Sequence, residues 1–305
     1  MMEKIKGKKI LVLGGGFGGV QAAINARSEL DSSHSVSIID RSRMSYLCGM
    51  NPMLIIGKRQ IGKTGRSLGR LANRGINFIE SEINSIDLTK KSVNTSQGNF
   101  IFDYLVIALG AEHDIHAVPG SQNAYSFWDF QSARKLRRRL SRFKKGKIIL
   151  AAAKPPYKCP PAPFETAMLI NSWAKEKDIR SNVDIHVYIP EPKPLGVAGH
   201  EASQRITSDL GKRGITLHTS AGITKISNNG KKAFFQDDSS SYADIIAVIP
   251  VHELPMVVQL SGVSGNKPWV PVNKKTLETT VKNVFAIGDV NVIPTGDFAI
   301  PKAGV

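Results

Sequence analysis

A glycine-rich loop between an apolar strand and a helix limits how this chain can fold more than any other segment. Residues 10–13 are apolar, residues 14–19 read Gly-Gly-Gly-Phe-Gly-Gly, and an alanine-rich helical segment follows. Gly14 permits a tight turn, Gly16 lets the backbone approach a pyrophosphate, and Gly19 lets the helix pack closely on the strand. The segment predicts the first strand, loop and helix of a Rossmann-like domain, and therefore an α/β fold.

A carboxylate follows at the position where such a domain binds the ribose of a dinucleotide. The β-branched strand at residues 35–39 ends in Asp40, which lies 26 positions after Gly14. A spacing of about 20 residues is typical of an acid that accepts hydrogen bonds from the adenosine ribose. The order strand, loop, helix, strand and acid therefore predicts a dinucleotide site.

Two later apolar strands also end in glycine. Residues 102–110 end in Gly110, and residues 284–289 end in Gly288 and Asp289. Each of these segments alone is also typical of an ordinary buried strand followed by a turn. Because both segments follow the first glycine loop in this order, they are predicted to contribute to the same dinucleotide site as that loop.

A second domain is predicted in the middle of the chain, but its loop differs from the first. A helical segment at residues 131–143 precedes an apolar strand at residues 147–152, and residues 184–189 and 243–249 supply further strands. The loop after residue 152 contains five prolines, at positions 155, 156, 160, 161 and 163, where glycines would be expected. Because proline lacks a backbone N–H, this loop is not expected to bind a pyrophosphate, and a nicotinamide cofactor is not expected.

The predicted domain boundaries follow from this order. Residues 1–120 form the first part of one domain, residues 121–255 form the second Rossmann-like domain, and residues 256–305 return to the first.

The proline-rich loop carries one of only two cysteines in the chain, Cys48 and Cys159. Two distant cysteines are unlike a secreted disulfide framework. Lys158, Lys154 and the start of a helix next to Cys159 predict a lowered thiol pKa and hence a reactive thiolate. The alternative is a small buried hydrophobic residue with no chemistry.

The segment Lys158-Cys-Pro-Pro-Ala-Pro-Phe-Glu165 resembles the redox-cysteine loop of the flavin-dependent sulfide oxidoreductases. This group contains the sulfide:quinone oxidoreductases and the flavoprotein subunit of flavocytochrome c sulfide dehydrogenase. Gly288-Asp289 and Pro301-Lys302-Ala-Gly304 match the same group, so the resemblance extends over nearly the whole chain. It implies two dinucleotide-binding domains of the glutathione reductase type, with FAD in the first and no functional nucleotide loop in the second.

The resemblance also implies which residues form the sites, and no metal site is among them. Residues implied to contact FAD are Gly14, Gly16, Phe17, Gly18, Gly19, Asp40, Arg41, Cys48, Ile83, Gly110, Gly288, Asp289 and Lys302. Cys159, Glu165 and Cys48 are implied to be catalytic. Glu165 is either a proton acceptor near the flavin or a first-turn helix residue stabilised by the helix dipole. Cys48 is a covalent attachment point for the flavin, a redox partner or sulfur shuttle for Cys159, or an inert packed residue.

The implied function is the oxidation of sulfide to sulfane sulfur or polysulfide at Cys159, with electrons passing through FAD to a quinone. Cytochrome c is the alternative acceptor if the chain is a flavocytochrome c subunit. A type II NADH:quinone dehydrogenase would need the glycine loop that Cys159 replaces, and a disulfide reductase would need two closely spaced cysteines. A non-catalytic basic flavoprotein that binds lipid or nucleic acid would leave Cys159 unexplained.

The chain is strongly basic, with 41 Lys and Arg against 25 Asp and Glu and a net charge of +16. Clusters at residues 134–139 and 144–145 indicate either a solvated helix face or a surface that attracts anionic lipids, whereas nucleic acid is not expected as a partner. No apolar run approaches the roughly 18 residues of a membrane-spanning helix. Without a recognisable signal peptide, we expect a peripheral protein of the cytoplasmic membrane. A homo-oligomer is a further candidate assembly.

The sequence stops at Val305, one residue after Gly304 of the family motif. The family's second redox cysteine and the C-terminal helices of its quinone pocket would follow this motif. The chain is therefore expected to be truncated, and the alternative is that Cys159 works alone or with Cys48.

Overall fold

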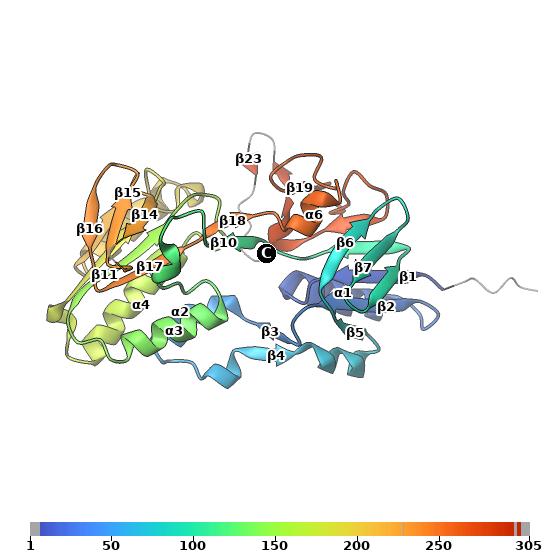
Figure 1. The fold of residues 1–305 in the computed structure, drawn as a ribbon, viewed down its shortest axis with the longest axis horizontal. Helices are drawn as coiled ribbons and strands as arrows, with labels where there is room; N and C mark the ends of the chain where they lie inside the picture. The colour runs from blue at the N-terminus through green and yellow to red at the C-terminus, as the bar shows by residue number, and fades with distance from the viewer. Residues whose placement is uncertain (1–6, 228, 296–297, 300–305) are drawn as a thin grey trace, which may run out of the picture. The chain divides into compact units, whose positions relative to one another are not determined.

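The computed structural model describes residues 7–227, 229–295 and 298–299, and it contains two compact units (Figure 1). The first unit comprises Met1–Tyr46, Gly65–Glu112 and Glu253–Val305, and the second comprises Leu47–Thr64 and His113–His252. Lys302, which was predicted to contact FAD, lies outside the described residues.

The first unit is built on a parallel five-stranded sheet with the order β20-β9-β1-β2-β5. Its strands are β1 (Lys9–Leu13), β2 (Ser35–Asp40), β5 (Asn77–Glu80), β9 (Tyr104–Ile107) and β20 (Val284–Ala286). Along β1, Ile10 and Val12 belong to one apolar cluster and Leu11 and Leu13 to another, because successive side chains of a strand point to opposite faces. Both faces of the sheet are therefore buried, which explains the uninterrupted apolar runs in the sequence.

Different elements cover the two faces of this sheet. Helix α1 (Phe17–Glu29) and a 3-10 helix (Leu68–Arg74) contribute Ala23, Leu68 and Leu71 to the cluster of Ile10 and Val12. The opposite face packs against an antiparallel sheet of β6 (Ile83–Asp87), β7 (Ser92–Thr95) and β8 (Gly98–Ile101).

The second unit has the same layers around a parallel sheet with the order β13-β12-β11-β17. Its strands are β11 (Gly146–Ala152), β12 (Val183–Tyr188), β13 (Ile215–His218) and β17 (Ile245–Ile249). The helices α3 (Phe130–Leu140), α4 (Ala162–Glu176) and α5 (His200–Gly211) cover one face. The antiparallel strands β14 (Ile223–Ser227), β15 (Lys232–Phe235) and β16 (Ser240–Tyr242) cover the other.

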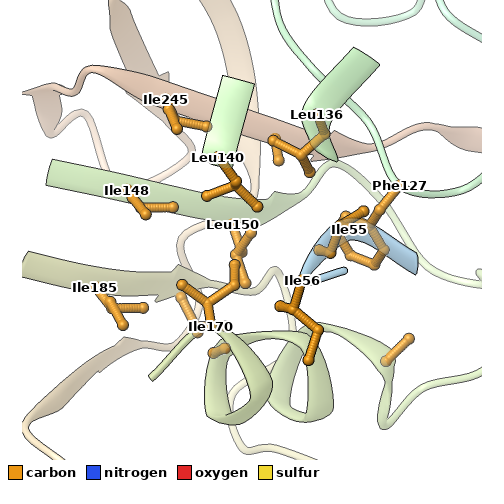
Figure 2. Packing of buried hydrophobic residues seen from close by; sticks show 14 of the residues in the cluster. Ile55, Ile56, Phe127, Leu136, Leu140, Ile148, Leu150, Ile170, Ile185 and Ile245 are labelled. Atoms are coloured by element: carbon orange, nitrogen blue, oxygen red, sulfur yellow. The ribbon is translucent and has the colours of Figure 1, made fainter. Parts of the chain in front are cut away.

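The core of the second unit includes a segment that the sequence did not assign to it. Figure 2 shows Ile55 and Ile56, from the end of α2 (Asn51–Ile55), in one cluster with Phe127, Leu150 and Ile170. Helix α2 packs against α3 and α4, and Leu54, Ile55 and Ile56 are buried in this contact. Residues 47–64 were expected in the first domain, whereas the structure places them in the second unit. The other two divisions, after residues 112 and 252, lie close to the predicted boundaries at 120 and 255.

The remaining elements are short. They are β3 (Met44–Tyr46), β4 (Gly65–Ser67), β10 (Glu112–Asp114), β18 (Val251–Glu253), α6 (Met256–Leu260), β19 (Val270–Pro271), β21 (Asn291–Val292), β22 (Pro294–Thr295), β23 (Phe298–Ala299) and the 3-10 helices Cys48–Met50, Ile61–Lys63, Ser121–Asn123, Arg180–Asn182, Gly196–Ala198 and Gly288–Val290.

The strand order β5-β2-β1-β9 of the first unit recurs as β13-β12-β11-β17 in the second, and the predicted α/β fold with two Rossmann-like domains is confirmed. In each unit, one strand leads through a loop to a helix and then to the next parallel strand. That strand is β1 in the first unit and β11 in the second. The loop between β11 and α4 therefore occupies, in its own unit, the position that the glycine loop occupies between β1 and α1.

Candidate functional site

The glycine loop of the first unit has the shape that a pyrophosphate needs. Gly14 has a φ of +101°, and a Cβ there would collide with the carbonyl oxygen of Ala108. A Cβ at Gly19 would collide with the carbonyl oxygen of Gly14, so the closeness of helix and strand requires glycine. At Gly16, in contrast, a Cβ would meet no described residue within 4 Å. Open space at this glycine is what a closely approaching phosphate requires.

Helix α1 begins at this glycine, so its first N–H groups lie at the loop. Gly16 is the N-cap residue and makes no side-chain cap hydrogen bond, and the first turn of α1 carries no acidic side chain. The first N–H groups of a helix have no partner within the helix, and they attract anions. Phe17 and Gly18 provide this first turn, and the Phe17 side chain is 61% exposed.

The predicted ribose acid is held next to the loop by the backbone. Asp40 Oδ2 accepts a 2.6 Å hydrogen bond from the Gly15 N–H, and Oδ1 accepts a 2.7 Å hydrogen bond from the Ser42 N–H. Two backbone donors fix the orientation of this carboxylate at the end of β2. The neighbouring Arg41 is exposed and lies 3.7 Å from the Glu82 carboxylate. Ile83 is half-buried at the start of β6.

The other predicted glycines lie at the same edge of the sheet. Strand β9 pairs with both β1 and β20, so the carboxyl ends of all three strands are adjacent. Gly110 follows β9 with a φ of +70°, and Gly288 follows β20 with a φ of +74°. Within the residues that the structure describes, a Cβ at either would meet nothing within 4 Å. Asp289 lies half-buried in the short 3-10 helix that starts at Gly288. Ligands of open α/β sheets bind outside the carboxyl ends of the strands, so these residues fit a dinucleotide such as FAD.

In the second unit the corresponding loop presents a thiol. Cys159 has a φ of +55°, in the left-handed region that few residues other than glycine adopt. Its carbonyl oxygen accepts a 2.9 Å hydrogen bond from the Ala162 N–H, which closes the turn into α4. The side chain of Cys159 is partly buried against the apolar core of this unit. Strained backbone at a cysteine is typical of a functional position rather than of simple packing.

The electrostatic surroundings of Cys159 differ from the sequence-based expectation. Burial and then the carboxylate of Glu165 raise the pKa of this thiol above its ordinary value. The Ala162 N–H and the Lys158 ammonium lower the pKa, but they do not outweigh the first two effects. The predicted lowering was wrong, because the sequence shows the lysines but not the depth of the thiol or the side on which Glu165 lies.

Glu165 and Cys48 both act on Cys159. Glu165 is exposed in the first turn of α4, as predicted, and its charge reaches the thiol. Cys48 is an exposed free cysteine in the 3-10 helix before α2, and its own charge raises the pKa of Cys159. Because α2 packs against α4, the structure brings the two thiols of the chain into one unit.

A buried aromatic and histidine cluster near the thiol loop escaped the sequence analysis. The Trp128 Nε1–H donates a 2.6 Å hydrogen bond to His252 Nε2, and His252 Nδ1 bonds the Pro250 carbonyl oxygen at 2.9 Å. The rings of His113 and His252 lie 4.7 Å apart. No local pattern indicates this cluster, because His113 lies in the middle of β10 and His252 in the middle of β18, and these distant strands pair only in the fold.

Both histidines are neutral near physiological pH. Burial, followed by the Lys158 ammonium, lowers the pKa of His113 to about 3. Burial alone outweighs the hydrogen bond to Pro250 and lowers the pKa of His252 to about 4, with Lys158 adding to the effect. Buried groups with strongly perturbed pKa values are candidates for a functional site.

Within the described residues, none of the helices combines the length and the apolar character that a membrane crossing would require.

Comparison with known families gives two matches that follow each other along the chain. Residues 8–150 match the sequence profile of the pyridine nucleotide-disulphide oxidoreductases. Residues 133–250 match the profile of the central part of the sulfide dehydrogenase [flavocytochrome c] flavoprotein chain. The second match covers the thiol loop and its sheet.

Individual relatives extend over nearly the whole chain. A sulfide-quinone reductase of Aquifex aeolicus is 27% identical over 98% of this chain and 73% of its own length. The mitochondrial sulfide:quinone oxidoreductase of Mus musculus is 24% identical over 97% of this chain and 68% of its own length. The crystal structure of the Aquifex aeolicus sulfide:quinone oxidoreductase superposes with a TM-score of 0.86 at 26% identity, covering 98% of this chain and 72% of that one.

The glycine loop, the strand-end glycines and Asp40 fit FAD, and the matched families are FAD-binding flavoproteins, so FAD is the cofactor. The chain belongs to the sulfide:quinone oxidoreductase and flavocytochrome c sulfide dehydrogenase flavoprotein family, within the pyridine nucleotide-disulphide oxidoreductases.

Proposed function

We propose that this chain oxidises hydrosulfide to sulfane sulfur at Cys159 and delivers the two electrons to a quinone. The overall reaction, HS⁻ + quinone + H⁺ → S⁰ + hydroquinone, balances in atoms and charge. The observation that carries the proposal is the free thiol of Cys159 in the position where the first unit has its phosphate-binding loop. FAD, when bound, supplies the two-electron acceptor chemistry that amino-acid side chains lack.

In this proposal Cys159 holds the sulfane sulfur as a persulfide and Cys48 is the second thiol of the pair. Support comes from the location of both free cysteines in one unit and from the electrostatic interaction between them. The thiolate, rather than the thiol, is the nucleophile in sulfur chemistry. A second thiol close by lets sulfur pass between two side chains before it leaves.

Glu165 is proposed as the proton acceptor for this site. Its carboxylate is exposed at the start of α4 and acts on the Cys159 thiol. Oxidation of hydrosulfide to sulfane sulfur releases one proton, and a carboxylate within reach of solvent can carry it away. The same negative charge holds Cys159 protonated until a substrate or a cation offsets it.

The loop around Cys159 argues against NADH as the electron donor. Its five prolines cannot donate backbone hydrogen bonds, and pyrophosphate binding depends on such donors. A type II NADH dehydrogenase and a flavocytochrome c subunit with cytochrome c as acceptor remain the alternatives that the following experiment separates.

The decisive experiment uses the FAD-loaded protein under anaerobic conditions and follows the flavin absorbance. Sulfide should bleach the flavin and NADH should not, and the opposite pattern would overturn the proposal. Cys159→Ala should abolish bleaching by sulfide, whereas Ser172→Ala, at an exposed position of the helix α4 that follows the thiol loop, should leave it unchanged.

Two further measurements concern the electron acceptor and the attachment of the flavin. Re-oxidation of the reduced flavin by a soluble quinone but not by cytochrome c identifies the acceptor. Acid precipitation shows whether the flavin stays attached to Cys48.

A peripheral position on a membrane is proposed on the basis of charge. Helix α3 carries Arg137, Arg138 and Arg139 in its last turn, and the whole chain has a net charge of +16. Juxtaposed basic side chains attract anionic lipid head groups. The protein should sediment with vesicles that contain phosphatidylserine and not with neutral vesicles, and charge reversal at Lys135 and Arg138, both exposed on this helix, should weaken the binding.

A further inference from the structure

His113 carries a polar atom that has no partner in the part of the chain that the structure describes. Its Nε2 is buried and forms no hydrogen bond with any described residue. Buried polar atoms in folded proteins are almost always hydrogen-bonded, so an exception calls for a ligand or water in the functional state. The neighbouring ring cannot serve, because both nitrogens of His252 are already bonded to Trp128 and Pro250.

Lys158 is a half-buried cation that also lacks a partner among the described residues. Its ammonium makes no ion pair and no hydrogen bond with the part of the chain that the structure describes. Its charge nevertheless reaches His113, His252 and Cys159, since it contributes to the pKa of all three. A lysine is seldom buried without a counter-charge. The partly buried ammonium of Lys158 therefore favours the binding of an anion.

The same surroundings hold His113 neutral. An imidazole that stays uncharged has one N–H, and with that proton on Nε2 it donates a hydrogen bond without giving the proton away. The rings of Trp128 and His252 pack beside the His113 ring, and the centroids of the Trp128 and His252 rings lie 5.6 Å apart. The ring of Trp128 also lies 6.2 Å from the ring of Tyr157, two residues before Cys159, so the cluster that contains His113 packs against the thiol loop that carries Lys158.

We propose that His113 Nε2 and the Lys158 ammonium form a binding subsite for a small sulfur anion beside Cys159. The ligand is hydrosulfide on entry, or the terminal sulfur of a growing polysulfide chain. Soft, singly charged sulfur anions fit one N–H donor and one ammonium, whereas a phosphate would need more donors. This inference rests on the proposed function, because it supplies the substrate subsite of the same thiol.

The first test compares an anionic and a neutral reagent that alkylate Cys159 by the same chemistry. Iodoacetate and iodoacetamide are applied to the FAD-loaded protein in a Cys48→Ser background, so that only Cys159 reacts. The subsite should make the iodoacetate-to-iodoacetamide rate ratio severalfold higher than that of a free thiol in solution. The ratio should fall at least fivefold in His113→Leu and in Lys158→Met, and Lys158→Arg should restore it.

Matched controls lie on the same segments. His116→Leu and Lys154→Met change exposed side chains of the same types near His113 and Lys158, and both should leave the ratio unchanged. A ratio equal to that of a free thiol, or one that the controls lower as much as the test variants do, would overturn the subsite. Because this test needs no sulfide, it stands or falls separately from sulfide oxidation.

The second test measures flavin reduction at increasing sulfide concentrations. His113→Leu and Lys158→Met should raise the half-saturating sulfide concentration at least tenfold while changing the limiting rate less than threefold. His113→Gln, which retains an N–H donor, should recover most of the loss. A fall in the limiting rate alone would contradict a binding role. If sulfide does not reduce the flavin while the alkylation ratio behaves as expected, the proposed function fails and the anion subsite remains.

Discussion

The indole Nε1–H of Trp128 donates a 2.6 Å hydrogen bond to Nε2 of His252. The other ring nitrogen, Nδ1, donates its hydrogen to the Pro250 carbonyl oxygen at 2.9 Å. Both nitrogens are therefore used in the neutral form of the ring, and the position of its single hydrogen is fixed. Protonation of His252 would place an N–H opposite the indole N–H, so this pair resists acid until the cluster opens.

Trp128→Phe should destabilise the second unit beyond the loss of indole volume. The substitution removes the donor and leaves His252 Nε2 buried without a partner, which costs about 1–3 kcal/mol. Trp173→Phe is the matched control, because Trp173 is 6% exposed against 5% for Trp128, and its indole bonds to none of the described residues. Urea unfolding should show a larger loss for Trp128→Phe, and equal losses would contradict the importance of the bond.

Acid should destabilise the folded protein through its two buried histidines. Their pKa values are about 3 for His113 and about 4 for His252 in the folded state, against about 6.5 for an unfolded histidine. Below about pH 6.5 the unfolded chain binds protons that the folded chain does not, so the stability present above that pH is lost as the pH falls. Each histidine should cost about 2 kcal/mol of unfolding free energy between pH 7 and 5.

Urea unfolding at the two pH values measures this effect. The double variant His113→Gln/His252→Gln should show a flatter dependence on pH, whereas His200→Gln, at an exposed position, should behave like the wild type. An unchanged slope in the double variant would assign the acid sensitivity to other groups.

Glu165→Gln should make Cys159 more reactive. The Glu165 carboxylate raises the pKa of the thiol, so its removal should increase the thiolate fraction at pH 8. Alkylation by neutral iodoacetamide, measured in a Cys48→Ser background, should become at least twofold faster. Glu201→Gln removes a carboxylate from the first turn of a different helix, α5, and should have no effect. An equal rate in both variants would show that Glu165 does not control the thiol.

Gly14→Ala and Gly16→Ala should separate folding from cofactor binding. At Gly14 the positive φ and the collision with the Ala108 carbonyl should reduce the stability of the unfilled protein by about 2–3 kcal/mol. At Gly16 an added Cβ meets none of the other described residues within 4 Å, so stability should change by less than about 1 kcal/mol. FAD affinity should nevertheless fall at least tenfold, which corresponds to about 1.4 kcal/mol. Thermal unfolding of the apoprotein measures the effect on stability, and titration with FAD measures the effect on affinity. An unchanged FAD affinity in Gly16→Ala would contradict the phosphate site.

The fold was predictable because its signals are local. The glycine loop at residues 14–19 admits few backbone conformations, and strands buried on both faces appear as apolar runs. Apolar runs also located the second sheet, and the prolines after β11 marked the loop that corresponds in position to the glycine loop of the first unit. Asp40 was found because its distance from the glycine loop reflects one strand, one helix and the next strand.

The other parts of the site depend on contacts between distant segments. Nothing near Cys48 in the sequence indicates that α2 packs against α3 and α4, so its unit could not be assigned. The direction of the Cys159 pKa depends on burial, which no local pattern shows. His113 and His252 are far apart in the sequence and meet only because β10 and β18 form a two-stranded sheet.

The placement of residues 47–64 has a practical consequence for dissecting this protein. The chain passes between its two units after Tyr46, Thr64, Glu112 and His252, so neither unit corresponds to one uninterrupted stretch of coding sequence. A gene fragment for residues 113–252 would omit Leu54, Ile55 and Ile56 and leave an apolar strip of α3 and α4 open to aggregation. A soluble thiol-bearing module would therefore have to be made as a fusion that joins residues 47–64 back to residues 113–252 through a designed linker.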